Sequence, residues 1–259
     1  MPIRPGRNLA PAASDYRWLL DRGYPDQGAL KLVGDRYRLT GAERGMLYRG
    51  VFGRDDSSRR ASRIVDRADL ARRGPASTLT SELTVDGHNV LFTIWNALAG
   101  RPVVLATDGF VRDIGGTRAR LPRDERFARI ATMLCAVLAK LPIRLVRIVL
   151  DDPLPWSRDH ASRIERIWAG LETRTAAQLT AGTSASVDSL VAATEAGMIA
   201  TSDTAIIDRC LVPVLDLGGL VVRGDSPGAT TGAQPIVMGR LIAAGPAPQG
   251  RLCRRPQIR

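Results

Sequence analysis

From residue 81 onward, short runs of β-branched and aliphatic residues alternate with longer segments of helical periodicity. The clearest helical segment spans residues 124–141, where apolar residues recur at intervals of three and four. Strands that alternate with helices favour a parallel sheet, because each return to a parallel strand needs a crossover connection. We therefore expect an α/β fold of three layers, with helices on both faces of the sheet. The expected strands lie at residues 83–85, 102–106, 143–150, 198–200 and 212–215.

Residues 14–73 have a different pattern and are expected to form a small all-α domain. The segment from Thr40 to Glu43 predicts a capping box at the start of a helix, and a basic helical stretch follows it. Pro75 to Thr78 is typical of a linker. The expected organisation is a basic helical domain with its linker at 1–80, an α/β domain at 81–221 and a Gly/Pro-rich basic tail at 222–259.

The charge of the chain favours a polyanionic partner. The formal net charge is +11, and the first 80 residues alone carry 16 Lys and Arg against 9 Asp and Glu. Such an excess favours nucleic acid over acidic small molecules as the partner. The competing interpretation is a general compositional bias without such a partner, since all but two of the 37 basic residues are arginine.

Composition excludes several classes of site. Cys135, Cys210 and Cys253 are too few and too scattered for a disulfide framework or a zinc site. The two histidines cannot form a histidine-rich metal centre. No apolar run approaches the roughly 20 residues of a membrane span, and the N-terminus lacks the apolar region of a signal peptide. We expect a soluble, cytoplasmic protein.

Aspartates follow the expected strands, and they are candidate ligands for a metal ion. Ligands of parallel α/β sheets bind outside the carboxyl ends of the strands, so these acids should converge on one edge. A single such Asp is commonly only a helix cap or turn residue. Several carboxylates together repel one another unless a cation or proton intervenes, and oxygen ligands without Cys select Mg²⁺ or Mn²⁺. The acids are Asp86 after the first strand, Asp108 and Asp113 after the second, Asp151 and Asp152 after the third, Asp203 after the fourth, and Asp188 near the start of a helix that leads into the fourth.

The segment VDGHNVLFTI contains the first of these acids. Asp86-Gly87 could form a hairpin turn, but residues 89–98 fit a helix better than a returning strand. Asn89 could cap that helix or contact a substrate. His88 could transfer protons, although a lone histidine more often packs or hydrogen-bonds structurally.

Two segments resemble a known family. VDGHNVLF resembles the first-strand motif of PIN-like nucleases, especially the NYN branch, in which Asp, Gly and Asn occur in this order. SVDSLVAATEAGMIATSDTAII resembles the later half of that domain, and the resemblance covers about residues 81–218. Residues 17–50 resemble a small helical domain of unknown function that precedes such a domain in a family of uncharacterised prokaryotic proteins.

The resemblance implies a metal-dependent nuclease that hydrolyses phosphodiester bonds, usually in RNA, with Mg²⁺ or Mn²⁺. By motif, Asp86, Asp188 and Asp203 would be metal ligands. Asp108 and Asp113 compete for the place of a fourth acid, with Asp113 counted among the metal ligands and Asp152 as a further candidate. The expected catalytic residues are Asp86, Asp108, Asp113, Asp188 and Asp203.

Five polar residues beside the acids are expected to contact the substrate. Arginine can hold a phosphate with two hydrogen bonds, and hydroxyl or amide groups can position its oxygens. The expected contacts are Asn89, Arg112, Arg118, Thr201 and Ser202. Two other functions stay open: a non-catalytic nucleic-acid-binding or scaffold protein on the same fold, and a phosphatase that acts on a small phosphoester. RNA is the expected partner, and a homodimer is left open.

Overall fold

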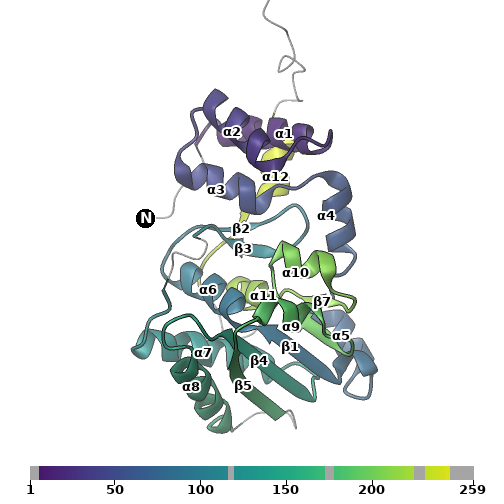
Figure 1. Cartoon of the computed structure of the whole chain (residues 1–259), viewed down its shortest axis with the longest axis vertical. Coiled ribbons are helices and arrows are strands. Elements are labelled where there is room, and N and C mark those ends of the chain that lie inside the picture. The colour runs from purple at the N-terminus through teal and green to yellow at the C-terminus, as the bar shows by residue number, and fades with distance from the viewer. Residues whose placement is uncertain (1–5, 116–119, 173–177, 225–230, 246–259) are drawn as a thin grey trace, which may run out of the picture.

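A five-stranded parallel sheet forms the lower half of the molecule in Figure 1, and helices of the N-terminal region lie above it. The computed structural model describes residues 6–115, 120–172, 178–224 and 231–245. The strands are β1 (Glu82–Asp86), β2 (Val103–Leu105), β3 (Val111–Asp113), β4 (Leu145–Asp151), β5 (Gln178–Ser184), β6 (Met198–Ala200), β7 (Val214–Leu215) and β8 (Ile236–Val237). The helices are α1 (Leu9–Leu20), α2 (Asp26–Arg36), α3 (Gly41–Gly50), α4 (Arg54–Ala61), α5 (Arg67–Arg73), the 3₁₀ turn η1 (Thr78–Thr80), α6 (Gly87–Leu98), α7 (Glu125–Leu138), α8 (Ser157–Ala169), α9 (Val187–Ala192), α10 (Thr204–Arg209), α11 (Leu217–Arg223) and α12 (Met238–Ala244). Within these ranges every helix is too short or too polar to cross a bilayer.

The strand order of the main sheet creates a crevice at its centre. The order is β5-β4-β1-β6-β7, and every pair in it is parallel. The chain therefore runs outward from β1 through β4 to β5 on one side, then returns to build β6 and β7 on the other side. Helices that leave β1 and β6 diverge to opposite faces, so ligands of such sheets bind between these strands at their carboxyl ends. The expected parallel α/β sheet is confirmed.

Helices cover both faces of this sheet, and alternate residues of each strand face opposite layers. Leu83 and Val85 of β1 are buried in the main hydrophobic core with apolar residues of α6, α7, α8 and α11. Val149 of β4 and Ile199 of β6 face the other way, into a second core with α9 and α10. The expected three-layer arrangement is therefore present.

The second expected strand does not join the main sheet. β2 pairs antiparallel with β3 and parallel with β8 in a separate three-stranded sheet. Val104 of β2 is fully buried in the hydrophobic core of the N-terminal helices. This strand is thus placed by contacts with segments far away in the sequence, which the local pattern cannot specify. The expectation that Asp108 and Asp113 follow a strand of the main sheet is therefore wrong, because β2 and β3 belong to the small sheet.

The N-terminal helices share their core with the end of the chain. Leu9, Tyr16 and Met46 pack in one cluster with Met238 of α12, and α1 lies against α12 (Figure 1). Residues 236–244 were expected to belong to a loose tail, but they form β8 and α12 because their apolar side chains complete this cluster. The expected basic end of that tail, residues 251–259, lies outside the described residues.

The region before β1 also contacts the main sheet directly. Val65 donates a backbone hydrogen bond of 2.9 Å to Val214 of β7. Leu70 of α5 is buried in the main core of the sheet. The helical region and the α/β domain are therefore joined by backbone pairing and by packing as well as by the chain itself.

Two elements of the fold have weak sequence signals. β5 at the edge of the sheet alternates half-buried and exposed residues and contains no apolar run, so periodicity does not reveal it. Its place is determined by parallel pairing with β4, from Leu145 with Gln178 to Asp151 with Ser184. α8 was likewise not assigned from the sequence, although Ile164 and Trp168 bury its apolar face.

We expect Gly197→Ala to destabilise the protein by ~1–3 kcal/mol. Gly197 has φ +69°, and a Cβ atom there would lie 2.1 Å from the backbone oxygen of Glu82. Gly182→Ala on β5 is the matched control, because a Cβ there meets no heavy atom within 4 Å. Its expected change is below ~1 kcal/mol. Urea unfolding of both variants measures the difference, and equal midpoints would contradict the expectation.

Candidate active site

Asp86 lies at the crevice between the two halves of the sheet. It is the last residue of β1 and the N-cap of α6, so the helix begins at Gly87 and the hairpin alternative is wrong. Its Oδ1 accepts a hydrogen bond from the backbone N–H of Asn89 at 3.3 Å. Its Oδ2 accepts one from the hydroxyl of Thr201, which follows β6, at 2.8 Å. The carboxylate therefore joins the ends of the two strands at which the strand order reverses.

The environment of Asp86 opposes its charge. The residue is only 5% exposed. Burial raises the pKa of its carboxyl to about 7, and the negative charges of Asp151 and Asp203 act in the same direction. Among the described residues no Lys or Arg forms an ion pair with it. Asp86 is thus a buried acid that is surrounded by acids and lacks a compensating cation.

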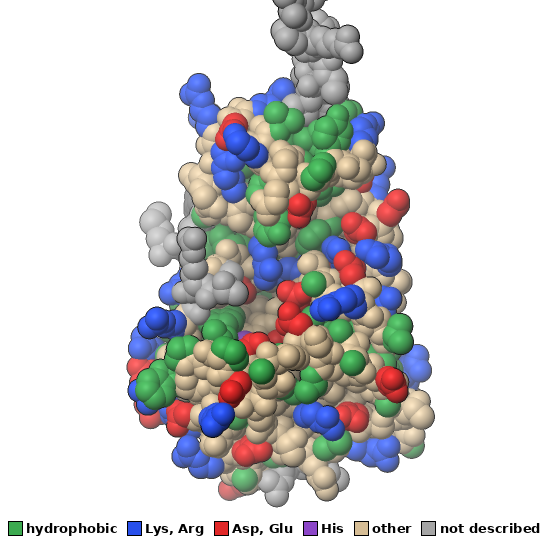
Figure 2. Space-filling model, in the orientation of Figure 1, with side chains coloured by type: hydrophobic (Ala, Val, Ile, Leu, Met, Phe, Trp, Pro, Cys, Tyr) green, Lys and Arg blue, Asp and Glu red, His purple; other side chains and the backbone are tan. Residues whose placement is uncertain are grey.

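Asp188 and Asp203 complete this group. Asp203 caps α10, where its Oδ1 accepts the backbone N–H of Ala205 at 2.8 Å. Asp188 lies in the first turn of α9, and its pKa is raised by partial burial and by the charges of Asp203 and Asp151. Figure 2 shows acidic side chains beside a hollow at mid-height on this face of the molecule, with basic side chains above it. We call Asp86, Asp151, Asp188 and Asp203 the acidic cluster.

Three of the polar residues expected to contact a substrate form hydrogen bonds that hold the cluster in place. The Oδ1 of Asn89 accepts hydrogen bonds from the backbone N–H of Ser202 at 2.8 Å and from its hydroxyl at 3.0 Å. The Oγ1 of Thr201 accepts the backbone N–H of Asp203 at 3.1 Å while its own proton goes to Asp86. These bonds tie the start of α6 to the loop after β6. The structure thus brings Asn89, Thr201 and Ser202 together with Asp86 and Asp203.

The end of β4 supplies Asp151 rather than Asp152. Asp151 is the last residue of β4, the strand that pairs with β1, and its Oδ2 lies 2.9 Å from Nδ1 of His88. The same ring nitrogen lies 2.9 Å from the backbone N of Asp151. Nδ1 either accepts the backbone N–H or, when protonated, donates to the carboxylate, and in both cases His88 is bonded to Asp151. Asp152 instead accepts from Arg158 and Thr183 at the surface. The sequence indicates this position of Asp151, because Asp151 ends an apolar run that predicts a strand parallel to the one that ends at Asp86.

Asp108 forms a buried ion pair away from the acidic cluster. Its two carboxylate oxygens accept from the two terminal nitrogens of Arg112 at 2.7 and 2.9 Å, and neither side chain is more than 1% exposed. The Nε of Arg112 donates to the backbone oxygen of Ser202 at 2.7 Å. The guanidinium is therefore fully engaged inside the protein. In this arrangement Asp108 neutralises Arg112, and Arg112 supports the loop that carries Ser202 from behind.

Asp113 has no hydrogen bond to the acidic cluster among the described residues. Asp113 ends β3 in the small sheet, where its Oδ1 accepts the backbone N–H of Gly115 at 2.9 Å. None of its hydrogen bonds reaches a member of the cluster. Arg118 lies outside the described residues.

The acidic cluster does not form a closed metal cage. Within the described residues, no three or more Asp, Glu, His or Cys side chains gather closely enough to hold a metal ion. Mg²⁺, however, is commonly bound by one or two carboxylates, with water and substrate phosphate as the remaining ligands. The chemistry of the acidic cluster, with all-oxygen donors and an uncompensated buried carboxyl, fits such an ion in kind.

Comparisons with known proteins place the chain in a family. Residues 76–219, more than half of the chain, match the family described as "Domain of unknown function (DUF5616)". The chain belongs to the DUF5616 family. Its DUF5616 domain contains β1 and the whole acidic cluster, and residues 8–63 match a second family, "Protein of unknown function (DUF434)".

One curated relative spans much of both chains. It is "Uncharacterized protein MJ0935" of Methanocaldococcus jannaschii, which is 23% identical over 157 residues. The similarity covers 61% of this chain and 71% of the relative. No solved structure matches.

Proposed function

We propose that the DUF5616 domain is a PIN-like domain of the NYN type, and that the chain is a Mg²⁺- or Mn²⁺-dependent nuclease that hydrolyses phosphodiester bonds in RNA. The observation that carries this proposal is the burial of Asp86 at the reversal of strand order, among acids and without a cation. A carboxyl in that position costs stability when it is ionised, and a divalent cation would offset this cost. The basic N-terminal region supports a polyanionic substrate.

The residues of the cluster have distinct roles in this proposal. Asp86 would hold the ion from the floor of the crevice, with Asp203 and Asp188 at the rim. Thr201 and Asn89 orient Asp86 and the loop after β6 through the hydrogen bonds described above. A bound ion would lower the pKa of a water molecule and stabilise negative charge on the attacked phosphate. His88 is held by Asp151 and acts as a positioning residue.

The alternative is a non-catalytic nucleic-acid-binding or scaffold protein on the same fold. One observation favours it: Asp86 and Asp203 both serve as N-caps, of α6 and α10. Because caps are a sufficient reason for an Asp at these positions, the capping bonds alone do not indicate catalysis. The two functions differ in their response to a divalent cation.

We expect Mn²⁺ to raise the thermal midpoint of the protein and to permit cleavage of RNA. An ion that binds only the folded state at a hundred times its dissociation constant stabilises it by about 2.7 kcal/mol. Asp86→Asn should lose most of this shift, whereas Asp124→Asn should retain it. Asp124 is a suitable control because it also caps a helix, α7, but lies in an exposed pair with Arg126. A wild-type protein that shows neither a shift nor cleavage would support the scaffold alternative.

A further inference from the structure

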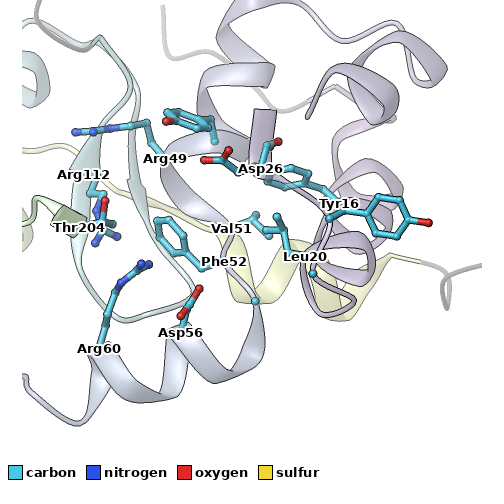
Figure 3. Close-up of a pocket in the computed structure, with 14 residues that line it drawn as sticks. Tyr16, Leu20, Asp26, Arg49, Val51, Phe52, Asp56, Arg60, Arg112 and Thr204 are labelled. Atoms are coloured by element: carbon cyan, nitrogen blue, oxygen red, sulfur yellow. Dashed lines mark hydrogen bonds between the residues drawn. The ribbon is translucent and has the colours of Figure 1, made fainter. Parts of the chain in front are cut away.

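A cavity of about 400 Å³ lies between the N-terminal helices and the α/β domain. Residues of α1, α3 and α4 line it together with Arg112 of β3 and Thr204 of α10 (Figure 3). Thr204 directly follows Asp203, so the cavity lies beside the start of α10, which Asp203 caps. Cavities of this size at the junction of two structural units commonly bind small ligands.

One wall of the cavity is cationic. Arg49 points across it toward Arg112 (Figure 3), and its Nε donates to the backbone oxygen of Asp113 at 3.3 Å. In the described part of the chain its two terminal nitrogens have no hydrogen-bond partner, and no carboxylate pairs with it. Arg60 is 6% exposed, and its Nε and Nη2 donate to the carboxylate of Asp208 at 2.8 and 2.7 Å. Its Nη1 has no hydrogen-bond partner among the described residues and lies 3.8 Å from Oδ2 of Asp108. Unsatisfied guanidinium nitrogens in a cavity wall fit an anion, and phosphate in particular.

Two acids, Asp26 and Asp56, also line the cavity. Asp56 pairs with Arg59 at 2.6 Å. Asp26 accepts the backbone N–H of Gln27 at 2.6 Å at the start of α2. Asp26 has no ion pair among the described residues, and Arg49 is the cationic side chain of the lining that is left for an anionic ligand.

The remaining wall is aromatic. The whole chain contains four tyrosines, and three of them, Tyr16, Tyr24 and Tyr48, line this cavity together with Phe52. Tyr24 and Tyr48 are 46% and 38% exposed, so their rings are open to a ligand. The ring of Phe52 is fixed between the guanidinium groups of Arg60 and Arg112, whose carbons lie 4.7 and 4.9 Å from its centre. Exposed rings in the same cavity as Arg49 suit a nucleobase and its phosphate, since bases stack on aromatic side chains.

We infer that this cavity binds a nucleotide, with the phosphate at Arg49 and the base against Tyr48 and Tyr24. The nucleotide is either free or part of an RNA strand that continues to the acidic cluster; the second source rests on the proposed nuclease function. The recognition chemistry is the same in both cases.

Fluorescence anisotropy of a short fluorescein-labelled oligouridylate, in EDTA so that no divalent ion is present, tests this inference. Arg49→Gln should weaken binding about ten-fold or more, because it removes a charged hydrogen bond to phosphate. It should also reduce the slope of log affinity against log salt by about one. Arg144→Gln is the matched control, because this exposed arginine directly precedes β4 and so lies at the amino ends of the strands, opposite to the carboxyl ends.

Tyr48→Ala is a second variant, which tests the site even if Arg49→Gln impairs folding. Its side chain is partly exposed, so the fold should be retained, and loss of stacking should weaken oligouridylate binding about five-fold or more. Adenosine monophosphate is added as a competitor. Displacement of the oligonucleotide identifies a site for a free nucleotide, and failure to displace it identifies a site for an RNA strand; both support the inference when Arg49→Gln or Tyr48→Ala weakens binding.

Wild-type affinity of both variants for the oligonucleotide and for the competitor would overturn the inference, as would the absence of binding by the wild-type protein. Binding that depends on Arg49, without Mn²⁺-dependent cleavage, would leave the nucleotide site standing and remove the nuclease proposal. Cleavage by a protein whose binding ignores Arg49 and Tyr48 would do the reverse.

Discussion

Asp86→Asn and Asp203→Asn should each abolish Mn²⁺-dependent RNA cleavage while the protein stays folded. Asn keeps the shape and one acceptor oxygen but removes the charge that holds a hard cation. Both residues cap helices, and Asn caps about as well as Asp, so the caps should survive. If the ion contributes several kcal/mol to the transition state, the loss is on the order of a thousand-fold in rate. Cleavage of RNA and thermal unfolding, each with and without Mn²⁺, measure the two effects.

Asp124→Asn provides the comparison for these variants, since it removes one carboxylate from an exposed helix cap far from the crevice. It should cleave RNA like the wild type. Wild-type cleavage rates in Asp86→Asn and Asp203→Asn would contradict catalysis by the acidic cluster. Loss of folding in both variants would instead show that these carboxylates support the fold in another way than as caps, since Asn retains the caps.

The stability of the apo protein should depend on pH through Asp86. The pKa of its carboxyl is about 7 in the folded protein and 3.8 for an ordinary Asp. A raised pKa means that the folded state retains a proton that the unfolded state releases, so stability from this group is complete below pH 4 and is lost as the pH rises to 7. The difference is on the order of 4 kcal/mol.

Asp86→Asn has no carboxyl at this position. In EDTA its free energy of unfolding should therefore increase relative to that of the wild type as the pH rises from 4 to 7. Above pH 7 the difference between the two proteins should become constant. Urea unfolding at several pH values measures it. A difference that does not vary with pH would contradict the burial of an uncompensated acid at this site.

The second large effect is expected for Asp108→Asn, which should destabilise the protein by ~3–5 kcal/mol. The substitution leaves the guanidinium of Arg112 buried without a negative partner, with both side chains at most 1% exposed. Asp152→Asn is the control, because it breaks an Asp–Arg pair whose Arg158 is 82% exposed. Such exposed pairs contribute at most ~1 kcal/mol. Urea unfolding compares the two variants.

The Mn²⁺ response distinguishes the two roles that the sequence allows for Asp108. If Asp108 only neutralises Arg112, the folded fraction of Asp108→Asn should retain the Mn²⁺-induced thermal shift. A variant of wild-type stability that no longer responds to Mn²⁺ would show instead that Asp108 is a ligand and that its pair with Arg112 opens.

Much of the α/β domain could be predicted from local patterns. The alternation of apolar runs and helical periodicity gave β1, β4, β6 and α7 within a few residues, because each is long or apolar enough to show its own period. The position of Asp86 at a strand end and helix start followed from the same patterns, as did those of Asp188 and Asp203 at the starts of α9 and α10. These are local properties of the chain, and they determine the type of each element and the residues at its ends.

Only the tertiary structure decided which strands share a sheet. β2 has the same kind of sequence as the strands of the main sheet, yet it pairs with β3 and β8 because Val104 packs among helices that precede it by more than fifty residues. That pairing places Asp108 and Asp113 beside strands of the small sheet, where Asp108 pairs with Arg112, and the pairing of β4 with β1 brings Asp151 to the carboxyl edge of the main sheet. The cavity of Arg49 and Tyr48 likewise exists only where α3 meets β3 and α10. Strand pairing and packing join segments distant in the chain, and no local period records them.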